Sequence, residues 1–456
     1  MKYSLSLLLA VGLTLFIWIG SVNWEYLSDY KLAPNPDAIT YLDLGQNVWL
    51  HGEYSRRPAA PYTPDFKWTP VFPVLAGGVN CLLGTAGIFV LNILLSTLSC
   101  LIIYRLAEYY VSAKAGTIAA CLFALDSLVW SLNFQAMSDI AFVTFVLAGL
   151  YFTLPTLFPK DNTETLSFWR LIPGGLGLSA AILTRPTGLY LPIVILLCYA
   201  IKLLFFRKNL IRSAAYALTF FVCSYSLAGL WMFRNYQTFG IFTLSGNENI
   251  VMVYYTGGGA WQTEFKCTLS EAQEKIQKEY NLPSDEICHN ADAFGKDPAE
   301  IDRQLKACKR DVLLKYPISL IKSAMIGVPK SLIAHETGIF ATLTKQDWQG
   351  AGKLFSNSPI LIIIFVWSVL FQVIVICGGV IGIIGSWFKN RDMRWAIFCS
   401  AGIAAYFILT MGLSGADCCA RYRLPLMPII IVFAAITLTT LWEKCKADSA
   451  NSKVKE

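Results

Sequence analysis

The residues of this chain whose types could do chemistry lie beside long apolar runs. Asp37 enters the first turn of a predicted helix, because Asn35 can cap it and Pro36 suits its first position, and Asp139 stands at the start of another apolar run. Basic residues border further runs: Lys67, Arg234, Arg421 and Arg423. Carboxylates can accept protons, and fixed cations can bind phosphate. Spacing alone also fits plainer roles, in which the carboxylates complement helix dipoles and the cations reach lipid headgroups.

The apolar runs indicate a polytopic membrane protein. The 456-residue chain is 55% hydrophobic and 15% charged, with a mean hydropathy of +0.52. A membrane-spanning helix needs about 20 mostly apolar residues. The sequence predicts about ten spans, the fifth of them short, at residues 3–22, 78–104, 115–133, 140–158, 171–184, 187–206, 213–232, 358–387, 395–413 and 424–442.

Basic residues are concentrated in alternate loops, which predicts the topology. If Lys2 is cytoplasmic, the basic loop residues Arg105, Lys114, Lys160, Arg170, Arg207, Lys208, Arg212, Lys389, Arg391 and Arg394 share its side, as does the lysine-rich tail. Both termini are then cytoplasmic, and the chain is expected in a bacterial inner (plasma) membrane. Residues 23–77 and 233–357 face the periplasmic or extracellular side.

The chain divides into three predicted regions. Residues 1–232 form an N-terminal transmembrane module whose first outer loop, 23–77, carries the acidic motif, and residues 358–456 form the C-terminal spans and the cytoplasmic tail. Between them, 233–357 holds a small helical extramembrane subdomain and, at 317–336, an interfacial helix. Cys267, Cys288 and Cys308 of the subdomain could form one disulfide or stay as buried thiols.

Several chemistries are disfavoured by the residues present. The three histidines and scattered cysteines have no zinc-ligand spacing, so no metal residues are predicted. Gly257, Gly258 and Gly259 are interpreted as a flexible turn rather than a phosphate loop. The net charge of +7 comes from basic residues beside apolar runs and not from a stripe with interleaved aromatics, so no nucleic-acid partner is expected. Asp126, inside the third span, must face protein or water or be neutral.

Short motifs recur in order at the outer ends of the spans. They are Asp37-Ala38 with Tyr41 and Gly52-Glu53-Tyr54, Lys67-Trp68-Thr69-Pro70 with Pro73, Met137-Ser138-Asp139, Thr184-Arg185-Pro186, Arg234-Asn235-Tyr236 with Phe239-Gly240, and Arg421-Tyr422-Arg423-Leu424-Pro425 with Pro428. Together they resemble the polyprenyl-phosphate-dependent GT-C glycosyltransferases, the superfamily of protein O-mannosyltransferases and lipid A aminoarabinose transferases. The resemblance implies an all-α polytopic GT-C-like bundle with juxtamembrane helices on its outer face.

The resemblance also implies residue roles. Asp37 would be the general base on an acceptor hydroxyl or amine, and Asp139 would orient the acceptor or support that base. Lys67, Arg234, Arg421 and Arg423 would hold the phosphate of a polyprenyl-phosphate sugar donor. Tyr41 and Tyr54 are candidates for substrate binding through their rings. No cofactor is assigned, although two outer carboxylates could host a divalent cation.

The partners predicted are membrane lipids, the lipid-linked donor and an acceptor of unknown kind, which could be a lipid, an envelope glycan or a protein. Two other functions stay open. A secondary transporter would use the intramembrane Asp126 and the outer arginines, and a noncatalytic envelope-assembly protein would keep the scaffold without needing Asp37. Neither the sugar nor the acceptor follows from the motifs.

Overall fold

The structure is a computed structural model that describes residues 36–160, 167–205, 209–334, 359–415 and 419–453. Within these ranges every regular element is a helix. The α-helices are α3 (Pro36–His51), α4 (Val71–Tyr110), α5 (Ala113–Ala124), α6 (Ser127–Asn133), α7 (Asp139–Leu157), α8 (Leu171–Ile182), α9 (Leu191–Phe205), α10 (Leu210–Phe239), α11 (Asn247–Ile250), α12 (Gly258–Phe265), α13 (Leu269–Tyr280), α14 (Asp285–His289), α15 (Pro298–Leu314), α16 (Pro317–Ile333), α19 (Pro359–Lys389), α20 (Arg394–Leu413) and α21 (Met427–Lys453). Short 3₁₀ and π turns occur at η2 (Phe168–Arg170), η3 (Pro186–Gly188), η4 (Val251–Gly257), η5 (Ala291–Phe294) and η6 (Ala420–Arg423).

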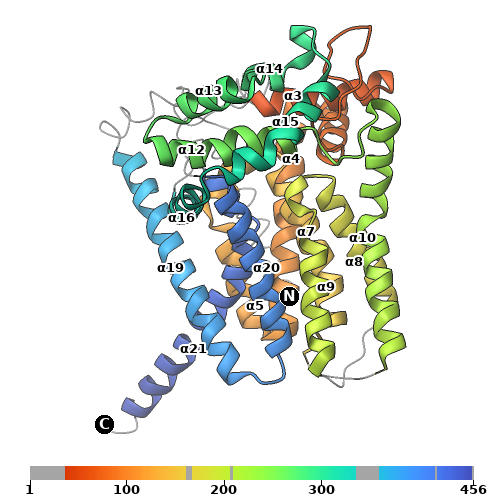
Figure 1. Ribbon diagram of the computed structural model, residues 1–456. Coiled ribbons are helices and arrows are strands. Elements are labelled where there is room, and N and C mark those ends of the chain that lie inside the picture. Colours follow the sequence, from red (N-terminus) through yellow and green to blue (C-terminus); the bar gives the residue numbers. More distant parts are fainter. Residues whose placement is uncertain (1–35, 161–166, 206–208, 335–358, 416–418, 454–456) are drawn as a thin grey trace.

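The long helices form an upright bundle capped at one end by a layer of shorter helices (Figure 1). In the bundle α8 packs on α7 and α10, α4 on α5 and α7, α19 on α21, and α9 on α20. One large apolar core joins these helices. The capping layer contains α3 and α12 to α15, and α16 lies between the layer and the bundle.

The predicted spans are largely confirmed. Seven helices of the described residues are long and apolar enough to cross a membrane, or up to nine if each of two bent pairs counts as one span. The short fifth span is α8, which has 12 residues and does not reach that length. The predicted first span, 3–22, lies outside the described residues. The all-helical, multi-pass architecture is therefore confirmed.

Two spans are irregular. Helix α4 has 40 residues and is kinked at Gly84, whose φ of 71° is available at little strain only to glycine. The predicted span 115–133 is broken by 57° between α5 and α6. Asp126 caps α6, because its Oδ1 accepts bonds from the Leu128 N–H at 2.9 Å and from Gln372 Nε2 of α19 at 3.0 Å. The intramembrane carboxylate thus faces protein.

Hydrogen bonds between helices show which helix ends lie together at each end of the bundle. Tyr110 Oη donates to the Phe158 carbonyl at 2.8 Å, and Lys202 Nζ donates to the Leu157 carbonyl at 2.8 Å. These bonds join the ends of α4, α7 and α9 that border the basic loops. At the opposite end Val71 N–H donates to the Leu183 carbonyl at 3.0 Å, two residues before Arg185, which pairs with Asp139. The basic loops therefore share one end of the bundle, and the acidic motifs share the other.

The subdomain predicted within residues 233–357 has its own apolar core, built around Tyr254, Trp261, Ile276 and Leu305. Its longer helices are α13 and α15, in agreement with the helical content predicted for this region. Helix α13 begins with a capping box, in which Thr268 and Glu271 satisfy each other's backbone N–H groups. Its three cysteines are free thiols, so of the two states left open the structure has the unpaired one.

The glycine triplet is not the flexible turn predicted from sequence. Gly257 ends the π-helical turn η4, and Gly258 and Gly259 begin α12. A Cβ at Gly257 would lie 2.6 Å from Val312 Cγ1, and one at Gly258 would lie 2.9 Å from Leu269 Cδ1. These glycines allow close packing inside the subdomain, and the prediction of a turn was wrong.

Helix α16 makes an 89° bend with α15. It buries a stripe of small residues, Ser319, Ser323, Gly327 and Ser331, and exposes large apolar side chains that include Ile318, Ile321 and Met325. An outward apolar face favours lipid as its surroundings, and the interfacial position of residues 317–336 stays a prediction.

Candidate active site

The candidate site is centred on Asp37, in the first turn of α3. Helix α3 lies close against α4, since a Cβ at Gly45 would lie 2.7 Å from Gly77 Cα. Asp37 Oδ2 is 3.8 Å from Arg421 Nη2 of η6, and the two side chains are 32% and 23% exposed. The structure thus brings together a predicted base and a predicted phosphate ligand that are far apart in sequence, and leaves both partly accessible.

A second ion pair adjoins the first. Asp139, buried at the start of α7, pairs with Arg185, which precedes Pro186 and η3. Tyr41 of α3 connects the two pairs, because its hydroxyl lies 3.5 Å from Ser138 Oγ. Burial and the charge of Asp37 raise the pKa of Tyr41, so its hydroxyl stays neutral and can serve as a hydrogen-bond donor.

Arg185 was not among the site residues predicted from sequence. Its signal was the Thr184-Arg185-Pro186 motif, in which an arginine at a span end is also consistent with a lipid-facing role. The contact with Asp139 shows that the side chain turns inward, with 19% of it exposed. This partner comes from a helix that precedes Arg185 in the chain and could not be read from the motif.

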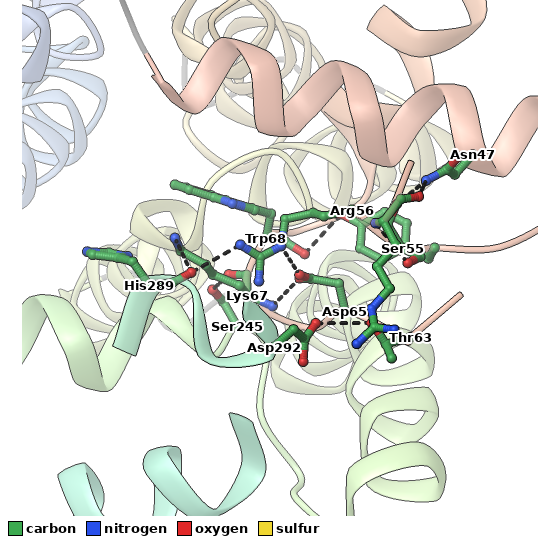
Figure 2. Close-up of polar contacts among 12 residues, drawn as sticks. Asn47, Ser55, Arg56, Thr63, Asp65, Lys67, Trp68, Ser245, His289 and Asp292 are labelled. Atoms are coloured by element: carbon green, nitrogen blue, oxygen red, sulfur yellow. Dashed lines mark hydrogen bonds and ion pairs between the residues drawn. The ribbon is translucent and has the colours of Figure 1, made fainter. Parts of the chain in front are cut away.

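Lys67 lies in the first outer loop, between α3 and the subdomain (Figure 2). Its Nζ donates to the His289 carbonyl at 3.4 Å and is 5.0 Å from the Trp68 ring centre. Burial, and next the charge of Arg56, lower the pKa of Lys67 to about 8. The charges of Asp65, Asp37 and Asp285 act in the opposite direction.

The loop that carries Lys67 is held by many contacts. Asp65 forms an ion pair with Arg56, and its Oδ1 accepts a bond from the Lys67 backbone N–H at 2.7 Å. Thr63 Oγ1 donates to Asp292 Oδ2 at 3.1 Å, and Ser245 Oγ donates to the Lys67 carbonyl. The subdomain therefore helps to fix the position of Lys67 (Figure 2).

Arg234 and Tyr54, two further predicted substrate ligands, make contacts within the same loop. Arg234 Nη1 donates to the Asp65 carbonyl at 2.7 Å, and its guanidinium lies 4.9 Å from the Trp231 ring centre. Tyr54 is buried, and its hydroxyl donates to the Trp68 carbonyl at 3.1 Å. Both side chains support the loop in this structure, and their roles in substrate binding stay predictions.

Arg423 is separated from Arg421. It is fully buried and donates to the carbonyl groups of Ser331, at 3.1 Å, and of Ala334. One turn of η6 therefore directs Arg421 toward Asp37 and Arg423 toward the end of α16. The contact of Arg423 with a donor phosphate also stays a prediction.

The subdomain contributes residues that sequence reasoning missed. Tyr255 Oη donates to Asp285 Oδ2 at 3.1 Å, and His289 Nε2 lies 3.5 Å from Asp285 Oδ1. Burial, followed by the charges of Lys67 and Arg56, lowers the pKa of His289 to about 3, so the imidazole is neutral. The i, i+4 spacing of Asp285 and His289 was the available signal, but their position beside Lys67 depends on tertiary contacts.

A divalent cation has no evident ligand set among the described residues. They contain no group of three or more His, Cys, Asp or Glu side chains that could hold a metal ion. The two carboxylates considered for such a role, Asp37 and Asp139, each lie beside an arginine. This donor set does not fit a divalent cation, so no step is assigned to one.

Parts of the sequence and the overall fold are similar to those of known proteins. Residues 67–231 match the family model of dolichyl-phosphate-mannose-protein mannosyltransferases. The archaeal oligosaccharyltransferase AglB from Archaeoglobus fulgidus, solved with an inhibitory peptide and a dolichol-phosphate, aligns with a TM-score of 0.55 at 14% identity over 99% of this chain and 52% of its own. The apo form of the Archaeoglobus fulgidus oligosaccharyltransferase gives a TM-score of 0.56 at 13% identity, covering 100% and 52%.

This chain spans about half the length of those oligosaccharyltransferase chains. ArnT from Cupriavidus metallidurans, bound to undecaprenyl phosphate, aligns over 92% of this chain and 77% of its own at 15% identity, and its TM-score of 0.42 is too low to define a shared fold. No curated protein sequence is significantly similar to this chain.

The chain has the fold of the oligosaccharyltransferase AglB, and part of it matches a mannosyltransferase family model. The family model that matches residues 67–231 and the fold shared with AglB both support the GT-C resemblance seen in the sequence motifs. The family match begins at Lys67 and also contains Asp139 and Arg185, whereas Asp37, Arg234 and Arg421 lie outside it.

Proposed function

We propose that this chain is a glycosyltransferase that moves a sugar from a polyprenyl-phosphate donor to an envelope lipid, glycan or protein at the non-cytoplasmic face of the membrane. The proposal rests chiefly on the 3.8 Å approach of Asp37 and Arg421 at the end of the bundle opposite the basic loops. A base and a phosphate-binding cation side by side are what attack by an acceptor and departure of a phosphate require.

The reaction is written from these residues as follows. The carboxylate of Asp37 takes the proton of an acceptor hydroxyl or amine, and the heteroatom's electron pair forms a bond to the anomeric carbon. The bond from that carbon to the phosphate oxygen breaks, and its electron pair stays on the phosphate. Arg421 and Lys67 stabilise the departing polyprenyl phosphate, Arg421 through its planar fork and Lys67 as a point charge.

Asp139, Arg185 and Tyr41 support the base in this scheme. The Asp139–Arg185 pair fixes the start of α7, and the neutral Tyr41 hydroxyl bridges α3 to it. The transporter alternative has less support, because Asp126 caps α6 and accepts a bond from Gln372. The noncatalytic alternative does not need Asp37 and therefore predicts that its replacement leaves function intact.

The test replaces Asp37 by Asn. Deletion of the gene should make a polyprenyl-phosphate sugar accumulate in membranes, and mass spectrometry of lipid extracts can detect it. Wild-type protein should remove that accumulation, whereas Asp37→Asn should not, because losing a general base slows transfer by roughly 10²–10⁴-fold. Binding of undecaprenyl phosphate to the purified variant should change less than about threefold, since the substitution is isosteric.

The matched control is Asp43→Asn, six residues further along α3, which should behave as the wild type. Full clearance of the lipid-linked sugar by Asp37→Asn would contradict the assignment of this residue as the base. No accumulation in the deletion strain would contradict the donor class.

A further inference from the structure

The ammonium of Lys67 makes few hydrogen bonds for a half-buried cation. Among the described residues, one hydrogen bond is found for its Nζ, to the His289 carbonyl at 3.4 Å, although an ammonium has three donors. The side chain is half-buried and rests beside the Trp68 ring. A partly desolvated cation with unused donors is a site prepared for an anion.

Arg56 explains why Lys67 lacks stronger partners. Its Nη1 donates to the same His289 carbonyl at 3.0 Å, which is shorter than the bond from Lys67, and its Nε forms the ion pair with Asp65. The Asp65 carboxylate is thus engaged by Arg56 and by the Lys67 backbone N–H. Lys67 therefore shares the His289 carbonyl with Arg56, and the Asp65 carboxylate is engaged by other groups.

The charges around Lys67 come from three elements. The loop supplies Arg56 and Asp65, α3 supplies Asp37, and α14 supplies Asp285. Arg56 disfavours the charged ammonium, and the three carboxylates favour it. His289, also on α14, is neutral and adds no charge.

We propose that Arg56 is a positioning residue for the donor site: by engaging Asp65 and the His289 carbonyl, it leaves the Lys67 ammonium available to a lipid-linked phosphate. This inference rests on the proposed function, because it assumes that Lys67 meets the donor. It adds that the subdomain helps to set donor affinity, since the shared carbonyl belongs to α14. When the phosphate binds, Lys67 exchanges one long hydrogen bond for a charge-assisted one, and Arg56 stays in place.

The first experiment measures the titration of the Lys67 amine in the absence of substrate. The rate at which an amine-reactive reagent acylates Lys67 is measured by mass spectrometry as a function of pH in the full chain in nanodiscs. The wild-type midpoint should lie at about 8. Arg56→Gln should raise it by about one pH unit, because a nearby cation is removed and Asp65 loses its partner. Arg56→Lys keeps the charge and should leave the midpoint near that of the wild type.

Arg57→Gln is the matched control, because Arg57 is the next residue and contacts the Pro61 carbonyl at 3.4 Å instead of Lys67. It should not move the midpoint. An unchanged midpoint in Arg56→Gln, or an equal shift in Arg57→Gln, would overturn the proposal. If Arg56→Gln does not fold, Arg56→Met retains the apolar stem of the side chain and takes its place.

The second experiment measures binding of undecaprenyl phosphate and, separately, of inorganic phosphate at pH 7. Arg56→Gln should weaken lipid binding roughly 10-fold, as expected when a charge-assisted hydrogen bond loses its geometry. Comparable affinity for both ligands in the wild type would mean that the site takes free phosphate and would overturn the lipid-linked donor. If the wild type binds neither ligand, the proposed function fails, while the labelling midpoint still reports on Arg56.

Discussion

At the residue scale, the proton on Lys67 should control donor binding. The pKa of Lys67 is lowered to about 8, so the ammonium is charged below that pH and neutral above it. A phosphate monoester is already a dianion there, since its second pKa is about 6. The affinity for undecaprenyl phosphate should therefore fall by about twofold between pH 7 and 8, where half of the ammonium loses its proton, and by roughly 10-fold or more as the pH rises toward 10. Equilibrium binding in nanodiscs across this range measures it.

Lys67→Arg is the control for the loss of undecaprenyl phosphate affinity at high pH. A guanidinium stays protonated throughout the range, so this variant should bind with little dependence on pH, even if its affinity at pH 7 is lower. A fall above pH 8 that persists in Lys67→Arg would assign the titration to another group.

Residue types at the predicted site were readable from sequence, but their partners were not. Arg421 and Arg423 stand two residues apart with the same chemistry, yet one lies beside Asp37 and the other donates to backbone carbonyls of α16 and its end. Arg234 likewise binds the Asp65 carbonyl. These differences depend on contacts between distant segments, which a motif does not specify.

At the element scale, the crossing of α3 and α4 should be sensitive to volume. A Cβ at Gly45 would collide with the Pro73 carbonyl oxygen and lie 2.7 Å from Gly77 Cα. Gly45→Ala should therefore displace α3, together with Asp37, and reduce clearance of the lipid-linked sugar by more than about 10-fold, as small misplacements of catalytic groups do. Thermal unfolding should show a lower Tm, because a tight contact is overpacked.

Gly229→Ala in α10 is the comparison for this variant, since a Cβ at Gly229 meets nothing within 4 Å. It should leave transfer unchanged and raise stability slightly, by up to about 1 kcal/mol, because alanine favours helix more than glycine does. Equal effects of the two substitutions would contradict the importance of the α3–α4 crossing.

Long apolar elements were predictable because their length is imposed by the bilayer. The start of α13 is also set by local chemistry, because Thr268 and Glu271 form a capping box there. The glycine triplet at 257–259 was misread, because the need for small residues there comes from Val312 and Leu269 of other helices. The break at Asp126 is of the same kind, since Gln372 of α19 completes the hydrogen bonding of the carboxylate.

At the scale of the whole molecule, chemistry and charge are divided between the two ends of the bundle. The basic loops meet where α4, α7 and α9 end, and the candidate site lies at the opposite end, under the subdomain. Charge asymmetry along the sequence was enough to predict this division, because the positive-inside preference acts on each loop separately. The outer segments are then held together by the contacts of Asp65, Thr63 and Ser245.

The division predicts the membrane orientation of the chain. Glu53 and Arg391 are exposed residues at the two ends, the first beside the candidate site and the second in a basic loop. With a membrane-impermeant maleimide on intact cells, Glu53→Cys should be labelled at once, and Arg391→Cys only after permeabilisation, because basic loops stay in the cytoplasm. The parent chain is labelled in parallel and the peptides are separated by mass spectrometry, since Cys81, Cys377 and Cys445 are also exposed. Labelling of both positions from the same side would contradict the bundle topology, and labelling of Arg391→Cys alone would place the site on the cytoplasmic face.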